Sequence, residues 1–358
     1  MKPIAVALEC SALCHHHPTG ISVYTHQLLH QLQNNPERVV ITPFYKEKFF
    51  KKKNFNYDLP AQSYLHRSLA RLGNNVLTHS TDSKFLYSKK RKNIVTIHDV
   101  AIFMKENEMP DYTDERMKMK TWKLNLEIAK YADKIITVSE KTKQDFCNIF
   151  GATPEKVVAI PLGFNSRVAT ESINDEHVLT TYNLRKGSYF LFVGAISIRK
   201  NILNILKAYK QSGLYENWPL VLAGPDSMGS STIAELKQQL GLNDYVRQTQ
   251  YLSEASIQAL YRNAGGFVFP TFYEGFGLPI LEAFSHGIPV LTSTKGAAPE
   301  VSGGHARLVD PFSVEEIANG LHNLMNSRPN PDALKQYANS FSWAKTAQKT
   351  IEVYQSLV

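Results

Sequence analysis

Residues 269–287 of the chain read FPTFYEGFGLPILEAFSHG. An apolar run ends at Pro270, a loop carries Glu274, and an apolar helical pattern follows. Proline near the start of a helix and glycine just past its end are typical helix punctuation, and Pro279 and Gly287 occupy these two places. The stretch therefore predicts a buried strand, a loop and a helix, which together form one unit of a parallel α/β sheet.

The loop of this stretch is a candidate anion site. Gly275 and Gly277 let the backbone approach a ligand closely, and the helix that follows presents the positive end of its dipole. A diphosphate is the expected ligand. Glu274 and Glu282 are eight residues apart, so one carboxylate can face a sugar while the other reaches a ribose. Taken alone, the pair is more simply a solvated loop acid and an acid near a helix N-terminus, but the complete string favours a ligand site.

Short β-rich runs alternate with helical patterns along the whole chain, which predicts parallel sheets flanked by helices. In the first half we expect strands at 4–8, 39–44, 76–79, 94–97, 134–138 and 157–160, and helices at 22–32 and 116–131. In the second half we expect strands at 189–193, 220–223, 246–250, 266–269 and 289–292, and helices at 202–210, 232–240, 254–263, 278–285 and 343–357.

These elements predict two Rossmann-like domains. The first spans 1–165, a polar linker region spans 166–187, the second domain spans 188–340, and a last helix at 341–358 crosses back. Ligands of such sheets bind at the carboxyl ends of the strands. A site in a cleft between the two domains is therefore expected.

The composition is that of a soluble globular protein, with 43% hydrophobic and 20% charged residues in 358. No run approaches the roughly 20 apolar residues that a membrane span needs. The three cysteines, Cys10, Cys14 and Cys147, form no disulfide framework and fit a reducing compartment. We therefore expect a cytoplasmic protein.

The net charge of +8 lies in the first half of the chain. Residues 1–165 hold 24 Lys and Arg against 16 Asp and Glu, whereas residues 166–358 hold 16 of each kind. The excess gathers in three runs, KEKFFKKK at 46–53, KKRK at 89–92 and RMKMKTWK at 116–123. A solvated basic face and an anionic membrane surface both explain these runs, and the interspersed aromatic residues and methionines suit the membrane. Nucleic acid is not an expected partner, because no recognition motif is present.

The string YEGFGLPILEA at 273–283 resembles the E-x7-E signature of the retaining glycosyltransferases of family 4, which have the GT-B fold. Other segments resemble motifs of this family in the same order over nearly the whole chain. They are PTGISVY at 18–24, TIHD at 96–99, TVSE at 137–140, IPLGF at 160–164, VGAISIRKN at 193–201, YLSEASIQALYRNA at 251–264, LVDP at 308–311 and FSW at 341–343. The resemblance implies an acceptor-side first domain and a donor-binding second domain, with parallel sheets facing across a deep cleft.

The resemblance implies a set of phosphate contacts for the nucleotide diphosphate sugar. The side chains of Arg199 and Lys200 would neutralise the donor diphosphate as it leaves. A basic pair at a helix start is disfavoured by the helix dipole, and this mild misfit itself points to a bound anion. The remaining phosphate contacts are implied for Gly20 in the first domain and for the backbone of Gly275, Phe276, Gly277 and Leu278.

The resemblance also implies contacts to the rest of the donor. Glu274 would bind hydroxyls of the donor sugar and stabilise positive charge at the anomeric carbon, so it is a candidate catalytic residue. Glu282 would accept hydrogen bonds from the ribose, and the backbone around Tyr251 and Leu252 would meet the base. His98, the second candidate catalytic residue, would bind a sugar hydroxyl without abstracting a proton, although a lone histidine after an apolar strand is more often a core or loop residue.

One position departs from the family pattern. Many relatives carry an arginine directly after the glycine of the phosphate strand, where this chain has Ala195. Arg199 is the expected substitute.

No metal cofactor is expected, because no Asp-x-Asp occurs and fixed cations would replace Mg²⁺ at the diphosphate. The cluster of Cys10, Cys14 and the histidines at 15–17 is a weak zinc candidate, since it lacks a second ligand pair. Cysteine–histidine hydrolysis is less favoured still, because no oxyanion-hole context is visible.

The motif combination looks most like bacterial mannosyltransferases of surface-polysaccharide assembly. The expected activity is therefore transfer of mannose from GDP-mannose to a lipid-linked, lipopolysaccharide or polysaccharide glycan, with the basic first domain on the inner face of the cytoplasmic membrane. A UDP-hexose donor is the nearest alternative. A sugar-nucleotide epimerase or phosphorylase and a non-catalytic sugar-nucleotide binding protein are the others.

Overall fold

The computed structural model describes residues 2–14, 19–46, 62–64, 77–83, 85, 87–104, 114–165, 174–326 and 329–358. The chain divides into two compact units. Unit 1 comprises Met1–Phe103, Asp114–Gly163 and Phe341–Val358, and unit 2 comprises Met104–Thr113 and Phe164–Ser340. Apart from the short segment Met104–Thr113, the chain forms unit 1 first, then unit 2, and returns to unit 1 for its last helix.

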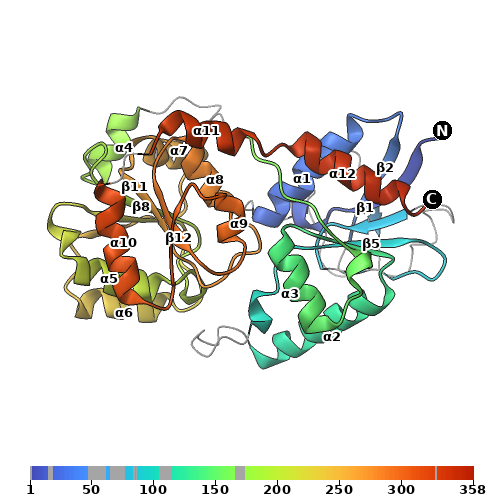
Figure 1. The fold of residues 1–358 in the computed structure, drawn as a ribbon, viewed down its shortest axis with the longest axis horizontal. Helices are drawn as coiled ribbons and strands as arrows, with labels where there is room; N and C mark the ends of the chain where they lie inside the picture. Colours follow the sequence, from blue (N-terminus) through green and yellow to red (C-terminus); the bar gives the residue numbers. More distant parts are fainter. Residues whose placement is uncertain are drawn as a thin grey trace. The chain divides into compact units, whose positions relative to one another are not determined.

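Unit 1 is built on a parallel sheet with the order β3-β2-β1-β4-β5-β6-β7 (Figure 1). Its strands are β1 (Ile4–Glu9), β2 (Val39–Lys46), β3 (Gln62–Tyr64), β4 (Leu77–Ser80), β5 (Asn93–Ile97), β6 (Lys134–Thr137) and β7 (Val157–Ala159). Strands β4 and β5 are entirely buried, as expected for inner strands of a parallel sheet covered on both faces. The six strands predicted for the first half are confirmed to within about two residues at each end, and β3 is additional.

Of the helices described in unit 1, all but the last begin at a side-chain cap. They are α1 (Gly20–Gln33), α2 (Glu115–Tyr131), α3 (Glu140–Phe150) and α12 (Trp343–Gln355), with short 3-10 turns at η1 (Ser11–Cys14), η3 (Ala101–Phe103) and η4 (Pro154–Lys156). Thr19 and Ser22 form a capping box at α1, and Ser139 caps α3. Gly151 ends α3 in the left-handed conformation, at φ 66°.

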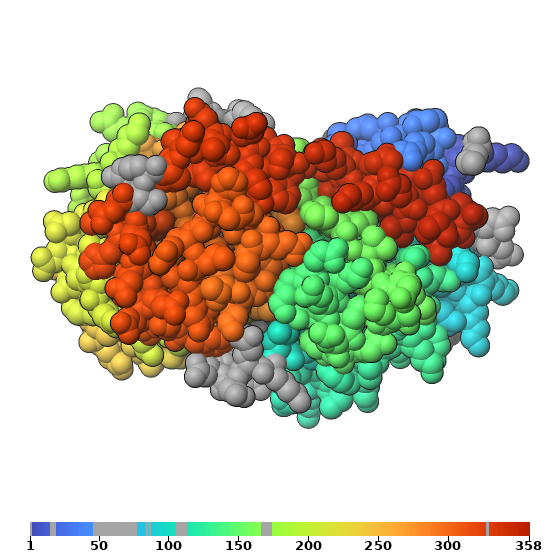
Figure 2. All heavy atoms as spheres, in the orientation of Figure 1, coloured from blue at the N-terminus to red at the C-terminus, as the bar shows by residue number. Residues whose placement is uncertain are grey.

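The last helix, α12, is part of unit 1. Tyr354 of α12 hydrogen bonds to Nδ1 of the buried His79 at 2.7 Å, and Nε2 of His79 lies 2.9 Å from the hydroxyl of Thr96. The hydroxyl of Tyr24 on α1 lies 2.9 Å from the same Thr96 oxygen. Figure 2 shows the surface of α12, in red, directly against that of α1, in blue. A buried hydrogen-bond chain therefore ties the C-terminal helix to β4, β5 and α1.

Unit 2 is built on a second parallel sheet, with the order β10-β9-β8-β11-β12-β13. Its strands are β8 (Phe190–Val193), β9 (Leu220–Ala223), β10 (Val246–Gln248), β11 (Gly266–Phe269), β12 (Val290–Ser293) and β13 (Arg307–Val309). The first five confirm the predicted strands, and β13 was not predicted. Strands β9 and β11 lie on opposite sides of β8, so the winding of the sheet reverses between β8 and β11.

The helices of unit 2 include α5 (Ile202–Ser212), α6 (Ser230–Gln239), α7 (Glu254–Asn263) and α8 (Leu278–Ser285), all four predicted. The others are α4 (Asp175–Thr181), α9 (Ala298–Ser302), α10 (Val314–Asn326) and α11 (Pro331–Asn339), with 3-10 turns at η5 (Ile198–Lys200) and η6 (Leu214–Glu216). In α10 the buried residues Ile317, Leu321 and Leu324 follow helical spacing, so a signal for this helix was present in the sequence.

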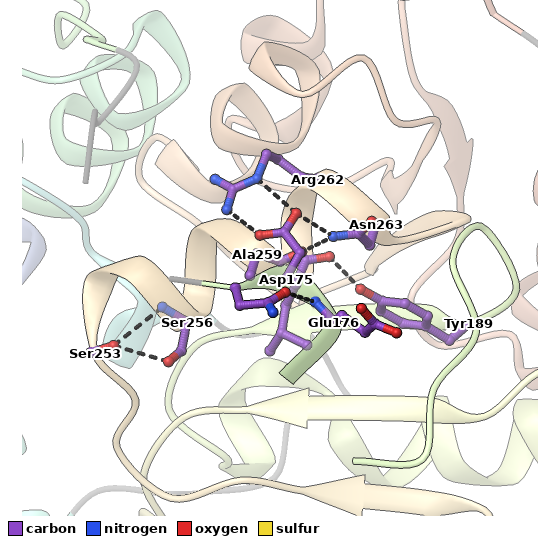
Figure 3. A network of polar contacts seen from close by, with 10 residues as sticks. Asp175, Glu176, Tyr189, Ser253, Ser256, Ala259, Arg262 and Asn263 are labelled. Carbon is purple, nitrogen blue, oxygen red and sulfur yellow. Dashed lines mark hydrogen bonds and ion pairs between the residues drawn. The ribbon is translucent and has the colours of Figure 1, made fainter. Parts of the chain in front are cut away.

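The range predicted as a linker region, 166–187, contains helix α4 of unit 2. Asp175, at the start of α4, pairs with Arg262 of α7 at 2.6 Å and accepts a hydrogen bond from Asn263 at 2.8 Å (Figure 3). The arginine lowers the pKa of Asp175, because its hydrogen bond and charge favour the ionised carboxylate. These contacts attach the segment to α7, and its charged surface is why it reads as a linker in the sequence.

The fold class predicted from the sequence is confirmed, since both units are α/β domains on parallel sheets. Within the part of the chain that the structure describes, no helix combines the length and apolar composition that a membrane span requires. The largest buried side chains include Phe190, Phe192, Phe267 and Phe269 of the second sheet. These rings form part of the core of unit 2.

Candidate functional site

The candidate site lies where the second sheet reverses its winding. Strands β8 and β11 are parallel neighbours, so the loops after Val193 and after Phe269 leave the sheet at the same edge. In doubly wound sheets a crevice forms at this switch point, outside the carboxyl ends of the strands. The loop after β8 carries the predicted cations, and the loop after β11 carries Glu274.

Lys200 and Glu274 form an ion pair across these two loops. Nζ of Lys200 lies 2.5 Å from Oε1 of Glu274, and each side chain is only 12% exposed. The same ammonium group lies 5.3 Å from the ring centroid of Phe269, where a cation–π attraction adds to the pair. The structure thus brings together two predicted site residues that are 74 positions apart in the sequence.

Two opposing influences act on the pKa of Glu274. Burial is the largest and raises the pKa, because it penalises the charged carboxylate. The positive charges of Lys200 and Arg199, with the hydrogen bond from Lys200, outweigh burial and lower the pKa overall. Glu274 is therefore ionised at neutral pH despite its burial, and Arg199 contributes to its electrostatic environment.

Asn201 holds the two loops in register, and the sequence analysis gave it no role. Its fully buried side-chain amide donates to the carbonyl of Pro270 at 2.8 Å and to that of Pro311 at 2.7 Å. Its backbone is left-handed at φ 64°, a conformation that asparagine tolerates better than most residues. Asn201 thereby fixes Lys200 beside the end of β11. The sequence signal for this role is the position of Asn201, directly after a basic pair and before a helix.

A third loop supports Glu274 from the other side. The amide of Ala297 donates to the carbonyl of Glu274 at 2.9 Å. Gly296 has φ 59°, and a Cβ placed on it would lie 2.8 Å from the backbone nitrogen and oxygen of Glu274. Only glycine allows this approach, so the backbone of Glu274 is held by the loop after β12.

The N-terminus of α8 follows directly after Glu274. Gly277 is the N-cap, has φ 105°, and leaves the helix without a side-chain cap. The first amides of an uncapped helix are orphan donors, and the helix dipole favours an anion there. This segment contains the predicted phosphate contacts Gly275, Phe276, Gly277 and Leu278.

Glu282 lies further along α8 and contacts α7. Its Oε2 accepts a hydrogen bond from the hydroxyl of Tyr261 at 3.0 Å, and the Tyr261 ring stacks on His286 with centroids 5.4 Å apart. Tyr261 therefore orients the carboxylate predicted to bind a ribose. Tyr251 and Leu252 lie in the loop between β10 and α7, and the Tyr251 side chain is 58% exposed. Their loop leaves the same edge of the sheet, two strands beyond β8.

The predicted site residues of unit 1 lie at the carboxyl edge of the first sheet. His98 follows β5, its Nε2 lies 2.8 Å from the carbonyl of Thr81, and its ring meets Tyr24 edge-on at 4.9 Å. Burial lowers the pKa of His98, so the imidazole is neutral at pH 7. Nε2 then carries the proton that the Thr81 carbonyl accepts, which leaves Nδ1 as an acceptor. Gly20 is the first residue of α1, and the space that its Cβ would occupy is open.

The predicted metal candidate gains no support. The histidines at 15–17 lie outside the described residues, and in the described ranges no three His, Cys, Asp or Glu side chains gather as a metal site. Burial raises the pKa of Cys10 well above its usual value, so its thiol is a poor nucleophile. Ala195, where an arginine was expected, follows Gly194 at the end of β8.

Comparison with known proteins gives two family matches that together span most of the chain. Residues 182–341 match "Glycosyl transferases group 1", and residues 18–167 match "Glycosyltransferase Family 4". The chain is 30% identical over 283 residues to the O-antigen chain mannosyltransferase B of Escherichia coli, covering 76% of this chain and 72% of that protein. It is 28% identical to the MMP alpha-(1->4)-mannosyltransferase of Mycolicibacterium hassiacum, covering 64% of this chain and 56% of that protein.

The fold is also similar to that of solved structures. The Anabaena protein HepE, crystallised with UDP and glucose, superposes with a TM-score of 0.74 at 15% identity, over 99% of this chain and all of that chain. At this identity the likeness concerns the fold.

Replacing Lys200 by methionine is predicted to change how stability depends on pH. In the native protein the pKa of Glu274 is lower than in the unfolded chain. The ionised carboxylate therefore stabilises the fold at pH values above the pKa of the unfolded chain. This stabilisation is lost as the pH falls through the pKa of the folded protein. Without Lys200 burial dominates and the pKa of Glu274 rises. The variant should be destabilised by on the order of 3 kcal/mol at pH 7, and the difference should narrow as the pH falls towards 4, measured by urea unfolding.

Lys335→Met is the matched control for this measurement. Lys335 pairs with Asp332 at 3.8 Å, and the two side chains are 46% and 92% exposed. An exposed pair of this kind contributes at most about 0.5 kcal/mol. If Lys200→Met behaves like Lys335→Met at both pH values, the ion pair does not govern the ionisation of Glu274.

Proposed function

Since the chain belongs to the glycosyltransferases of group 1 and family 4, with the GT-B fold, we propose that it transfers mannose from GDP-mannose to a glycan hydroxyl. The two relatives named above, at 30% and 28% identity, are named mannosyltransferases, and this supports the choice of sugar. The acceptor proposed is a lipid-linked, lipopolysaccharide or polysaccharide glycan, by analogy with the O-antigen chain relative. The family membership expected from the sequence is confirmed.

The observation that carries the proposal is the cluster of Arg199, Lys200 and Glu274 at the switch point of unit 2. It places two cations, one ionised carboxylate and the uncapped start of α8 along a single loop edge. Cations and amide donors suit a diphosphate, and the carboxylate suits a sugar that develops positive charge. Unit 2 is therefore proposed as the donor unit, with Glu282 at the ribose and the backbone of Tyr251 and Leu252 at the base.

In the proposed reaction the bond between the anomeric carbon and the β-phosphate oxygen breaks, and the acceptor oxygen bonds to the same carbon. Arg199, Lys200 and the first amides of α8 stabilise the negative charge on the leaving diphosphate. Glu274 stabilises the positive charge at the anomeric carbon. Its partner Lys200 carries the charge that the diphosphate requires, so these fixed cations are proposed to serve where other transferases use Mg²⁺.

The acceptor is proposed to attack from the face that the diphosphate leaves, so the configuration is retained. An oxygen of the leaving diphosphate accepts the proton of the acceptor hydroxyl, and no separate base is required. Unit 1 is proposed as the acceptor side, with Gly20 approaching phosphate and His98 binding a donor-sugar hydroxyl. The neutral imidazole of His98 has Nδ1 available as an acceptor, which fits hydroxyl binding.

A second donor class has a specific observation in its favour. HepE, whose fold is similar, binds UDP and glucose in the crystal. A UDP-hexose donor is therefore the alternative to GDP-mannose. An epimerase or phosphorylase and a binding protein without turnover are the further alternatives, and a product assay separates all of them.

The test is a product assay in which GDP-mannose and UDP-hexoses are compared with and without a glycan acceptor. We expect acceptor-dependent release of GDP from GDP-mannose. Glu274→Gln should bind the nucleotide within about threefold of wild type and lose roughly 10²- to 10³-fold in transfer rate, because the stabilising carboxylate is gone. Glu235→Gln, an exposed glutamate of α6 in the same unit, is the control and should keep full activity.

Other outcomes identify the alternatives. Product formation from UDP-hexoses but not from GDP-mannose would mean that the donor is a UDP-hexose. Conversion of the nucleotide sugar without an acceptor would indicate an epimerase. Dependence on free phosphate would indicate a phosphorylase. Unchanged turnover in Glu274→Gln would remove Glu274 from the mechanism.

We also infer that unit 1 docks on the cytoplasmic face of an anionic membrane. Helix α2 exposes Met117 and Met119, at 61% and 53%, between the basic residues Arg116, Lys118 and Lys120. Exposed apolar side chains among lysines suit an interface in which methionines insert and ammonium groups meet lipid phosphates. The first basic run, at 46–53, lies almost wholly outside the described residues.

Liposome co-sedimentation tests this inference. Binding is expected with vesicles that contain anionic lipid, and it should weaken as salt is raised. The double variant Met117→Ser with Met119→Ser keeps every charge and should bind about tenfold more weakly. Met228→Ser, which removes a 56% exposed methionine of unit 2, should bind like wild type. Equal partition onto neutral and anionic vesicles would rule out electrostatic docking.

A further inference from the structure

A pocket of about 460 Å³ lies in unit 1 at the edge of the sheet opposite to the candidate site residues. Leu77 and Asn93, the first residues of β4 and β5, line it, as does Asp133 immediately before β6. The pocket is therefore at the amino ends of these strands, whereas Gly20 and His98 lie at the carboxyl edge. Neither the donor nor the acceptor contacts proposed above use it.

The pocket wall is strongly basic. The consecutive residues Lys89, Lys90, Arg91 and Lys92 all line it, and Asp133 is the one acidic side chain among the lining residues. Asp133 is already engaged, since it pairs with Lys92 at 3.1 Å and accepts the backbone N–H of Asn93 at 2.8 Å.

Two of these lysines are exposed and uncompensated. Among the described residues, Lys89 and Lys90 have no carboxylate partner. Among the side chains that line the pocket, four are positive and one is negative.

The basic turn is held in place by a buried side chain. Asn93 is 2% exposed, and its amide nitrogen donates to the carbonyls of Ser88 and Arg91 at 2.9 and 2.7 Å. Its side-chain oxygen accepts the N–H of Ser88 at 3.0 Å. The fold thus fixes a turn of like charges, whose mutual repulsion costs free energy. A bound anion would offset that cost.

Two tyrosines flank the basic turn. The rings of Tyr87 and Tyr131 lie 4.9 Å apart, and both side chains are about two-fifths exposed. Nζ of Lys130 lies 5.0 Å from the Tyr131 ring centroid, which places a further cation beside this ring. The pocket therefore offers phenolic hydroxyls and ring faces beside its cations.

We propose that this pocket binds a phosphate group, carried by either a soluble phosphorylated compound or a phospholipid head. Lysine clusters bind phosphate as point charges, and the volume suits a small molecule or a head group. The tyrosine rings provide an apolar surface for the part of the ligand that bears the phosphate. The site lies in unit 1, so it is separate from the donor diphosphate site proposed in unit 2.

Hydrogen exchange measured by mass spectrometry tests the proposal at the site itself. Inorganic phosphate is compared with chloride at constant ionic strength, and exchange is read in the peptide that covers 88–93. At a phosphate concentration ten times its dissociation constant, backbone amides that exchange only after phosphate has dissociated should exchange about tenfold more slowly. The peptide covering 199–201 reports the donor site independently, so failure of one proposal is distinguishable from failure of the other.

The variants Lys89→Gln with Lys90→Gln and Arg116→Gln with Lys120→Gln form a charge-matched pair. Both double variants remove two exposed cations of unit 1. Lys120 is 11 residues before Tyr131 on α2, about 16 Å along the helix axis from the pocket. The slowing of exchange at 88–93 by inorganic phosphate should be lost in the first variant and kept in the second.

A second arm uses phosphatidic acid in phosphatidylcholine vesicles against phosphatidylcholine alone. Protection of 88–93 by both inorganic phosphate and these vesicles supports a pocket that accepts the phosphate from either source. Protection by the vesicles alone identifies the lipid head group as the ligand. The proposal is overturned if neither inorganic phosphate nor the vesicles slow exchange at 88–93, or if both double variants lose the protection by inorganic phosphate equally.

Discussion

The ion pair between Lys200 and Glu274 is the interaction on which the candidate site depends. It joins loops that leave adjacent strands, and it forms where burial would otherwise neutralise the carboxylate. Asn201 holds the Lys200 loop, because its side chain donates to carbonyls that follow β11 and β13. Gly296 holds the Glu274 loop, because it packs closely against the backbone of Glu274. The surrounding sheet therefore serves to present one cation and one carboxylate side by side.

Much of the fold could be predicted because glycines and prolines in the sequence indicate where helices begin and end. Helix α8 was placed to the residue, since Gly277, Pro279 and Gly287 bracket an apolar helical pattern. Strand β13 has three residues, of which only Val309 is buried, so no apolar run marks it in the sequence. Helix α4 carries a polar surface and depends on the contact of Asp175 with Arg262, so its sequence resembles a linker. Such elements are fixed by tertiary contacts, and local patterns do not record them.

The residues of the site could be predicted more readily than their geometry. The string from 269 to 287 and the RKN segment pointed to Glu274, Lys200 and the start of α8. Nothing local indicates that Lys200 pairs with a residue 74 positions away, because that contact follows from the order of strands β8 and β11. Asn201 was overlooked because its role requires the left-handed backbone and two distant carbonyls. The KKRK run similarly reads as a solvated face until Asn93 is seen to hold it around a pocket.

The central claim is that the Lys200–Glu274 edge of unit 2 grips a diphosphate. The most direct measurement is a crystal structure of the protein with bound GDP. We expect a β-phosphate oxygen within about 3 Å of Nζ of Lys200, with the first amides of α8 directed at the same phosphate. A nucleotide bound elsewhere, with Lys200 still paired to Glu274 and the start of α8 facing solvent, would contradict it.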